Sequence, residues 1–384
     1  MFKALIGLSI AIVPFAILPM RDMRLFQVEL AVCLALLTGL SGLFTQTIKP
    51  VANIFLFLLV GYLGIHAMIS PKPDIQLFGM AVENFWMYKP LFYILSYFIL
   101  IYAISGMQLS HLHIKLILNM MMYAGLIQAV YCILQFFYID QLFGLNHHDP
   151  IGRVAGFLGN PTLVAQFIAL TVPLTLYNKK IIYTVIMLIA IAMTDSQMAF
   201  VAVTGGVLVY YAMKSKRSMK FAISLMIAIC LFLSLGGMRY FNDSSRFEHW
   251  TKITKEVNTP IDNANGQSFP LTGVGIGSFA YTYHIKNHNN YQQAHNDYLE
   301  WLFNTGLIGL ALLLLSIIWM LKDTVWDYLR FGIKVSRYRR SLISSFACVA
   351  IGAFGTFVWQ IGPIALYSAI IVGLLHNNEE IEYV

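Results

Sequence analysis

Long apolar runs separated by short polar clusters make up most of this chain. A membrane-spanning helix needs about 20 predominantly apolar residues, and the runs approach or reach that length repeatedly. The pattern therefore predicts an all-α fold, a polytopic membrane helical bundle of about 12 transmembrane helices. The predicted spans lie near residues 4–20, 25–44, 51–70, 90–109, 116–138, 161–177, 181–194, 198–213, 220–236, 302–321, 341–357 and 361–375.

One long polar stretch, residues 237–301, interrupts this pattern between the ninth and tenth predicted spans. Lipid-exposed irregular backbone does not occur in the hydrocarbon core, because its polar groups have no water to bind there. We therefore expect residues 1–384 to form a single integral membrane domain. Its long loop, 237–301, is expected to be extracytoplasmic, to contain short helices and to carry the active site.

Composition supports the membrane class and excludes a soluble one. The chain is 58% hydrophobic and 11% charged, whereas soluble domains carry about 25% charged residues. The formal charge of +7 could indicate a nucleic-acid partner, but most Lys and Arg form short clusters between apolar runs. Such a bias orients membrane proteins. It predicts a multi-pass membrane protein with both termini cytoplasmic, and no nucleic-acid partner.

Few polar or ionisable residues lie inside the predicted spans, and Glu29 and His66 are among the clearest. Ion-coupled transporters usually place several ionisable groups along a pathway near the membrane midplane. Their scarcity argues against transport. A transporter or flippase that uses the long loop as a gate remains the alternative function.

The first candidate binding segment precedes the sixth predicted span and contains Arg153, Gly156, Asn160 and Pro161. Pro161 suits the first turn of a helix, and Asn160 is a natural N-cap. The segment is therefore either a turn with a helix cap or a site where Arg153 faces an anion. The two interpretations are compatible.

The long loop opens with a predicted amphipathic helix that starts near Asp243. Arg246, Trp250, Ile253 and Val257 share one face of it at 100° per residue. An arginine on the apolar face is either a snorkelling anchor at the membrane surface or a fixed phosphate ligand.

A glycine triplet follows, formed by Gly273, Gly275 and Gly277. The spacing is not that of a dinucleotide-binding motif. Glycine permits close approach to another helix or to a ligand head, and both options remain open. Next in the loop, His284 and His288 have helical i, i+4 spacing but lack the accompanying Glu of a zinc protease motif. We expect no metal site.

His295 differs from the other histidines because it stands directly before the tenth predicted span. Asn296, Asp297 and Tyr298 lead from it into that span. An imidazole at the mouth of a helix has a reproducible position, and its ordinary pKa near 6.5 suits a general base at neutral pH.

Together these segments resemble the O-antigen ligase and O-antigen polymerase superfamily of membrane glycosyltransferases. The resemblance covers about residues 151–310. Its strongest parts are the runs 273–279, 294–299 and 305–310, and the Arg153 segment and the Arg246–Trp250 pair match further family patterns.

The resemblance implies transfer of a glycan from an undecaprenyl-diphosphate carrier to an acceptor hydroxyl at the outer face of the bacterial inner (cytoplasmic) membrane, in cell-surface polysaccharide biosynthesis. The reaction would be metal-independent and inverting and would need no cofactor. The partners would be the lipid-linked donor, a glycolipid or glycan acceptor, and membrane lipid. Ligase and polymerase activities differ in the acceptor, which is lipid A core or another repeat unit, and this choice stays open.

By the same resemblance, His295 would be the catalytic base and Arg246 would clamp the diphosphate. Two departures from the family pattern stand out: Gln197 replaces a usual arginine, and Asn304 replaces a usual glutamate. Arg153 is the proposed substitute for the missing cation. The substrate-binding residues implied by the resemblance are Arg246, Arg153, Asn296, Gly273, Gly275, Gly277, Trp250 and Tyr298.

Overall fold

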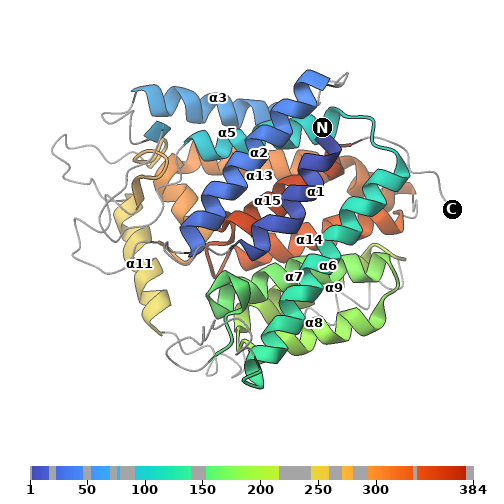
Figure 1. The fold of residues 1–384 in the computed structure, drawn as a ribbon. Helices are drawn as coiled ribbons and strands as arrows, with labels where there is room; N and C mark the ends of the chain where they lie inside the picture. Colours follow the sequence, from blue (N-terminus) through green and yellow to red (C-terminus); the bar gives the residue numbers. More distant parts are fainter. Residues whose placement is uncertain are drawn as a thin grey trace.

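The computed structural model describes residues 2–16, 23–45, 53–69, 76–77, 91–139, 153–215, 244–258, 270–279, 293–331 and 335–377. Within these ranges the chain is helical and forms no β-strand, so the predicted all-α class is confirmed (Figure 1). The elements are α1 (Phe2–Ile12), η1 (Val13–Phe15), α2 (Met23–Thr45), α3 (Ile54–Ile69), α5 (Leu91–Gly106), α6 (His111–Phe136), η3 (Gly156–Leu158), α7 (Pro161–Tyr177), α8 (Ile181–Met193), α9 (Gln197–Ala212), α11 (Ser244–Asn258), α13 (Asp297–Phe331), α14 (Arg337–Gly352), η5 (Val358–Gln360) and α15 (Gly362–His376).

Three of the described helices are long and apolar enough to cross a membrane: Phe26–Phe44, His111–Phe136 and Asp297–Lys322. Most of the other helices in the bundle are apolar but shorter. The predicted span at 220–236 lies outside the described residues, and the total of twelve spans stays a prediction.

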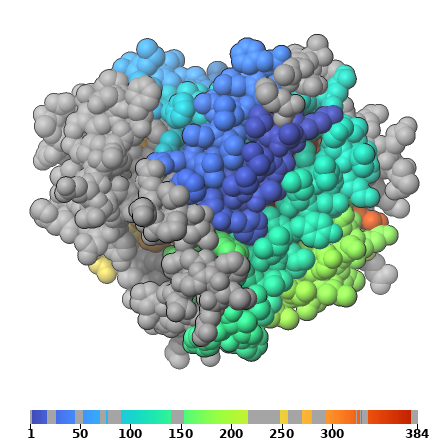
Figure 2. Space-filling view, in the orientation of Figure 1, coloured from blue at the N-terminus to red at the C-terminus, as the bar shows by residue number. Residues whose placement is uncertain are grey.

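The outward face of α6 shows that the bundle is built for an apolar surrounding. Its exposed side chains include Leu112, Leu116, Ile127 and Val130, which share one face at helical spacing. A helix of a soluble protein would carry polar residues on its outer face. The apolar outer face therefore identifies a membrane protein. Figure 2 shows α6 lying against α1, which in turn lies against α2, on one side of the molecule.

Close backbone approach at small residues holds neighbouring helices together. A Cβ added to Gly206 of α9 would meet the Cys348 sulfur of α14 at 2.2 Å and the Ser344 carbonyl oxygen at 2.9 Å. The Ser344 hydroxyl donates a hydrogen bond to the Gly206 carbonyl, 2.6 Å away. Small residues and interhelical hydrogen bonds are the usual means of helix association where lipid surrounds the protein.

Buried glutamines fix the segment around η3 to one end of the bundle. The Gln128 amide oxygen accepts a hydrogen bond from the Phe157 N–H (3.2 Å), and the Gln135 amide oxygen accepts one from the Gly156 N–H (2.8 Å). The Gln27 amide of α2 donates to the Phe157 carbonyl oxygen, 3.0 Å away. The turn that carries Arg153 is thus attached to both α2 and α6.

Candidate functional site

The helix α11 is fixed beside the segment that carries His295. Figure 1 shows α11 lying across the ends of longer helices instead of running along them. The Trp250 indole N–H donates to the Ala294 carbonyl oxygen (2.8 Å), and His249 Nε2 donates to the Gln293 carbonyl oxygen (3.3 Å). Two consecutive residues of α11 therefore hold two consecutive carbonyls that immediately precede His295.

A small hydrophobic core reinforces this contact. Ile253 of α11, Ala294, Phe279 and Phe303 are buried together, with Trp250 packed against them. Ile253 and Trp250 belong to the apolar face predicted from the sequence. The helix uses this face to pack on the protein.

Arg246 lies on α11 one turn before Trp250. Its backbone is helical, as predicted, whereas its side chain lies outside the described residues. His284 and His288 also lie outside them.

His295 has a left-handed backbone, with φ 51°. This region is uncommon for residues other than glycine and is held only where the surroundings enforce it. Here the Ala294 N–H donates to Glu300 Oε2 (3.2 Å), and the Asp297 N–H donates to the Ala353 carbonyl oxygen (2.8 Å). The half-buried imidazole lies edge-on to the Phe357 ring, with 5.2 Å between ring centroids.

Two buried carboxylates, Asp297 and Glu300, lie in the first turn of α13 beside His295. The Gln360 amide nitrogen donates to both of them, at 3.2 Å to Asp297 Oδ1 and 3.0 Å to Glu300 Oε2. The Trp359 N–H donates to Asp297 Oδ2, 3.0 Å away. The segment between α14 and α15 is therefore attached to the turn that positions His295.

Asn296 and Tyr298 have structural contacts in addition to their predicted binding roles. The Asn296 amide oxygen accepts from the Leu299 N–H at 3.1 Å, so it caps the start of α13. The Tyr298 hydroxyl donates to the Ala350 carbonyl oxygen at 2.9 Å, and its ring packs on Phe354.

The glycine segment 270–279 docks at a break in α13. The break is at Gly306, which has φ 65° and ψ −171°. Backbone groups freed by a broken helix need other partners, and here the glycine segment and Tyr62 supply them. The bonds run from Val274 N to Phe303 O (3.1 Å), Gly275 N to Asn304 O (2.8 Å), Tyr62 Oη to Thr305 O (2.8 Å), Leu307 N to Pro270 O (3.0 Å) and Ile308 N to Leu271 O (3.1 Å).

Glycine is required at this junction. Gly273, Gly275 and Gly277 all have positive φ. A Cβ on Gly273 would lie 2.5 Å from the Asn304 carbonyl, and one on Gly275 would overlap the Gln76 amide. The sequence left open whether these glycines approach another helix or a ligand head. The described contacts of Gly273 are with a helix, α13.

Asn304 and Gln197, the two departures from the family pattern, lie near the glycine segment and near the turn after α14. The Asn304 amide oxygen accepts from the Phe279 N–H at 2.9 Å, which helps to hold the glycine segment on α13. Gln197 is the exposed first residue of α9. The next residue, Met198, packs under Gly355 in the turn that leads to Phe357.

Residues 182–314 match a protein-family model described as O-antigen ligase. This region of the chain therefore resembles an O-antigen ligase domain. This finding confirms the predicted resemblance to the O-antigen ligase and polymerase superfamily and supports a glycosyltransferase-like role in polysaccharide biosynthesis. Comparison with curated proteins gives no match.

The matched region, residues 182–314, runs from α8 to the middle of α13. It includes α11, the glycine segment and His295, which the structure brings together. Arg153 precedes the matched region, on a turn attached to α2. This turn is connected to the segment around His295 through two contacts. Gln27 of α2, which bonds to the turn, packs against the start of α15, and Gln360, just before α15, bonds to Asp297.

His249, Glu300 and Gln360, which hold the segment around His295, were not predicted as site residues from the sequence. His249 stands next to Trp250 and one turn before Ile253, so its position beside the apolar face was detectable. Glu300 was visible as an acidic residue in the first turn of a span. Gln360 left no local signal, because its partners lie about sixty residues earlier in the chain.

Burial lowers the pKa of His249 below its ordinary value, and the hydrogen bond to the Gln293 carbonyl opposes this effect. His249 is 3% exposed. It is therefore a neutral donor that holds the loop at neutral pH.

Proposed function

We propose that the protein is an inverting membrane glycosyltransferase that moves a glycan from an undecaprenyl-diphosphate carrier to an acceptor hydroxyl. The observation that carries this proposal is the position of His295 within the region that matches the O-antigen ligase model. Its backbone is enforced by contacts from α11, from α13 and from the turn after α14. Such enforcement is typical of a side chain that must be positioned before the reaction begins.

In the proposed reaction, the neutral His295 imidazole takes the proton of the acceptor hydroxyl. The acceptor oxygen forms a bond to the anomeric carbon as the bond from that carbon to the diphosphate oxygen breaks. The diphosphate leaves on the carrier lipid with the bonding electron pair, and the configuration at the anomeric carbon inverts. General base catalysis contributes about 10²–10⁴-fold to such a step.

Arg246 and Arg153 are proposed to neutralise the diphosphate. A hydrogen bond from a charged donor contributes about 1.5–3 kcal/mol. Arg246 is one turn from Trp250, which touches the residue before His295. Arg153 is proposed to supply the positive charge that an arginine usually provides at the position of Gln197. Trp250, Asn296, Tyr298 and the three glycines of the docked segment are proposed to shape the donor site.

The proposed topology has twelve spans in the bacterial inner membrane, both termini in the cytoplasm and the 237–301 loop outside. Donor and acceptor would then meet at the outer face of this membrane. The reaction is of ligase or polymerase type, depending on whether the acceptor is lipid A core or another repeat unit.

Glycolipid gels of a deletion strain distinguish these activities. Bare core is expected for a ligase, core with one repeat for a polymerase, and an unchanged ladder would contradict both. Complementation with His295→Ala should fail to restore the ladder, whereas wild type should restore it. Equal membrane levels of the two proteins are the control. Near-normal glycan transfer by His295→Ala would refute the base assignment.

A further inference from the structure

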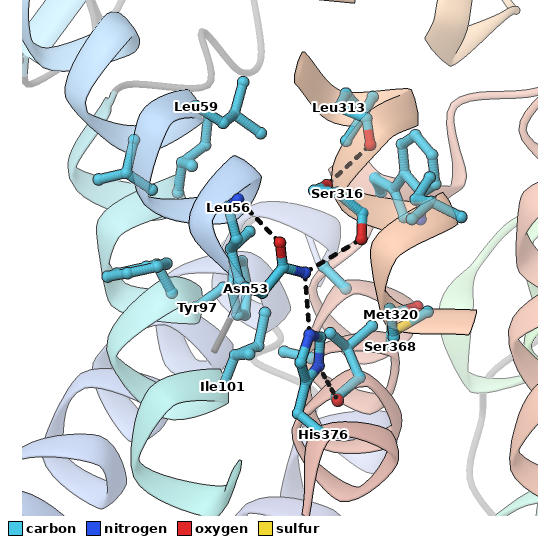
Figure 3. A pocket seen from close by; sticks show the side chains of 18 of the residues that line it. Asn53, Leu56, Leu59, Tyr97, Ile101, Leu313, Ser316, Met320, Ser368 and His376 are labelled. Carbon is cyan, nitrogen blue, oxygen red and sulfur yellow. Dashed lines mark hydrogen bonds between the residues drawn. The ribbon is translucent and has the colours of Figure 1, made fainter. Parts of the chain in front are cut away.

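A cavity of about 210 Å³ lies between the pair α3 and α5 and the pair α13 and α15. Its walls are almost entirely apolar, with Leu59, Ile94, Phe98, Leu313 and Val372 among the lining residues. Neither His295 nor Trp250 lines it. Figure 3 shows side chains from both helix pairs facing one another across this space.

One end of the cavity is closed by a neutral network around Asn53 (Figure 3). The Asn53 amide nitrogen donates to the Ser316 carbonyl oxygen (3.0 Å) and to His376 Nε2 (2.9 Å). Its amide oxygen accepts from the Leu56 N–H, and His376 Nδ1 donates to the Val372 carbonyl oxygen. Because these groups have partners within the protein, this end requires no polar ligand.

Two residues in the wall differ from this pattern. Tyr97 of α5 and Trp301 of α13 both line the cavity, and their hydroxyl and indole N–H are buried without a hydrogen-bond partner in the described part of the chain. Buried polar groups are nearly always paired. Two unpaired donors beside an apolar space therefore call for a ligand that carries an oxygen acceptor.

Trp301 also fixes the polar end of such a ligand. It directly follows Glu300, so it lies at the end of the bundle where α13 begins, while Asn53 and His376 close the other end. Tryptophan is enriched at membrane interfaces, which is the depth of the ester groups of bilayer lipids. The cavity then continues inward from Trp301 as a hydrocarbon-lined space.

We infer that the cavity binds one acyl chain of a bilayer lipid, with the ester oxygen accepting hydrogen bonds from Trp301 and Tyr97. The chain extends toward Asn53 and His376. The described lining contains no Lys, Arg, Asp or Glu, which excludes a charged headgroup inside. An isoprenoid chain carries no oxygen along its hydrocarbon and would leave both donors unpaired. This lipid site is independent of the proposed glycosyl transfer.

The test uses the purified full-length chain in detergent and phosphatidylglycerol with a photoreactive diazirine on one acyl chain. Labelling is expected on peptides of α3, α5, α13 and α15. Trp301→Phe keeps the aromatic bulk and removes the donor, so labelling should fall about 2- to 10-fold, as for one lost neutral hydrogen bond. Tyr97→Phe should act in the same direction. Trp326→Phe, on the exposed part of α13, should leave labelling unchanged.

Two further experiments test whether the cavity binds an acyl ester and not another lipid. A diazirine-bearing linear isoprenoid hydrocarbon of similar length, which has no oxygen, should label these peptides weakly and equally in wild type and Trp301→Phe. Ala369→Phe, which fills the cavity, should abolish labelling by phosphatidylglycerol while thermal unfolding confirms a folded protein. Strong labelling by the isoprenoid hydrocarbon, or phosphatidylglycerol labelling that survives both Trp301→Phe and Tyr97→Phe, would overturn the inference.

Discussion

At the scale of single residues, the left-handed backbone of His295 is the most informative feature. A non-glycine residue in this conformation costs about 1–3 kcal/mol. The Ala294 carbonyl held by Trp250 and the Ala294 N–H held by Glu300 offset this cost. Both backbone polar groups of Ala294 are thus fixed immediately before the proposed base, so its position depends on α11 as well as on α13.

Trp250→Phe tests whether this tryptophan positions His295 or binds substrate. The variant removes the indole N–H and keeps most of the packing, so the stability loss should be about 0.5–1.5 kcal/mol. If Trp250 acts through His295, kcat for glycan transfer should fall several-fold with little change in KM for the donor. A raised KM with unchanged kcat would instead assign Trp250 to the donor site. Steady-state kinetics on the purified enzyme separate the two.

The neutral His249 predicts an effect of acid on stability. Its pKa is lowered in the folded protein, so the unfolded chain binds the proton at a higher pH than the folded one does. Protein stability should therefore fall as pH decreases below about 6.5, the ordinary histidine pKa. Thermal unfolding between pH 7.5 and about 5 measures the slope. His249→Gln should flatten it, and an identical slope in the variant would show that other groups cause it.

At the scale of elements, the break in α13 explains why the glycine segment and the helix must be considered together. The carbonyls and N–H groups freed around Gly306 have partners in the segment that begins at Pro270. Ile276 packs toward α3 and α5, while Phe279 packs toward α11. The docked segment therefore joins the loop helix to the membrane bundle.

Gly306→Ala should uncouple these elements. A Cβ at this position would lie 2.3 Å from the Leu271 carbonyl oxygen, on a backbone with φ 65° and ψ −171°. The steric conflict and the backbone strain should together destabilise the protein by more than about 2 kcal/mol. Thermal unfolding in detergent measures this loss.

Gly64→Ala is the matched control for this change. It lies within α3, and an added Cβ there meets nothing within 4 Å. Since alanine favours helix over glycine by about 1 kcal/mol, the control should be neutral or stabilising. Equal destabilisation by both substitutions would contradict a specific role for the break.

The sequence predicted helices better than it predicted their contacts. Apolar runs located the described membrane helices, and the face shared by Trp250 and Ile253 predicted that α11 would pack on an apolar surface. The break at Gly306 was not predicted, because it depends on a partner about thirty residues earlier. Hydrophobic patterns report local burial, whereas such pairings arise only when the chain folds.

At the scale of the whole molecule, contacts near His295 come from distant parts of the chain. Trp250, Glu300 and Gln360 all hold the same short segment. These residues belong to α11, to the start of α13 and to the turn before α15, so these elements meet at the side of the bundle where His295 lies. The alternation of helices along the chain then predicts that Lys179, after α7, lies at the opposite side.

Chemical labelling of single cysteines tests this arrangement together with the predicted orientation. In a background where the native cysteines are replaced, Thr251→Cys on α11 and Lys179→Cys after α7 occupy exposed positions. A membrane-impermeant maleimide added to intact spheroplasts should label the cysteine at 251 and not that at 179. Permeabilised cells should label both, which controls for accessibility. The reverse pattern would place His295 in the cytoplasm, where a carrier-linked glycan at the outer face could not reach it.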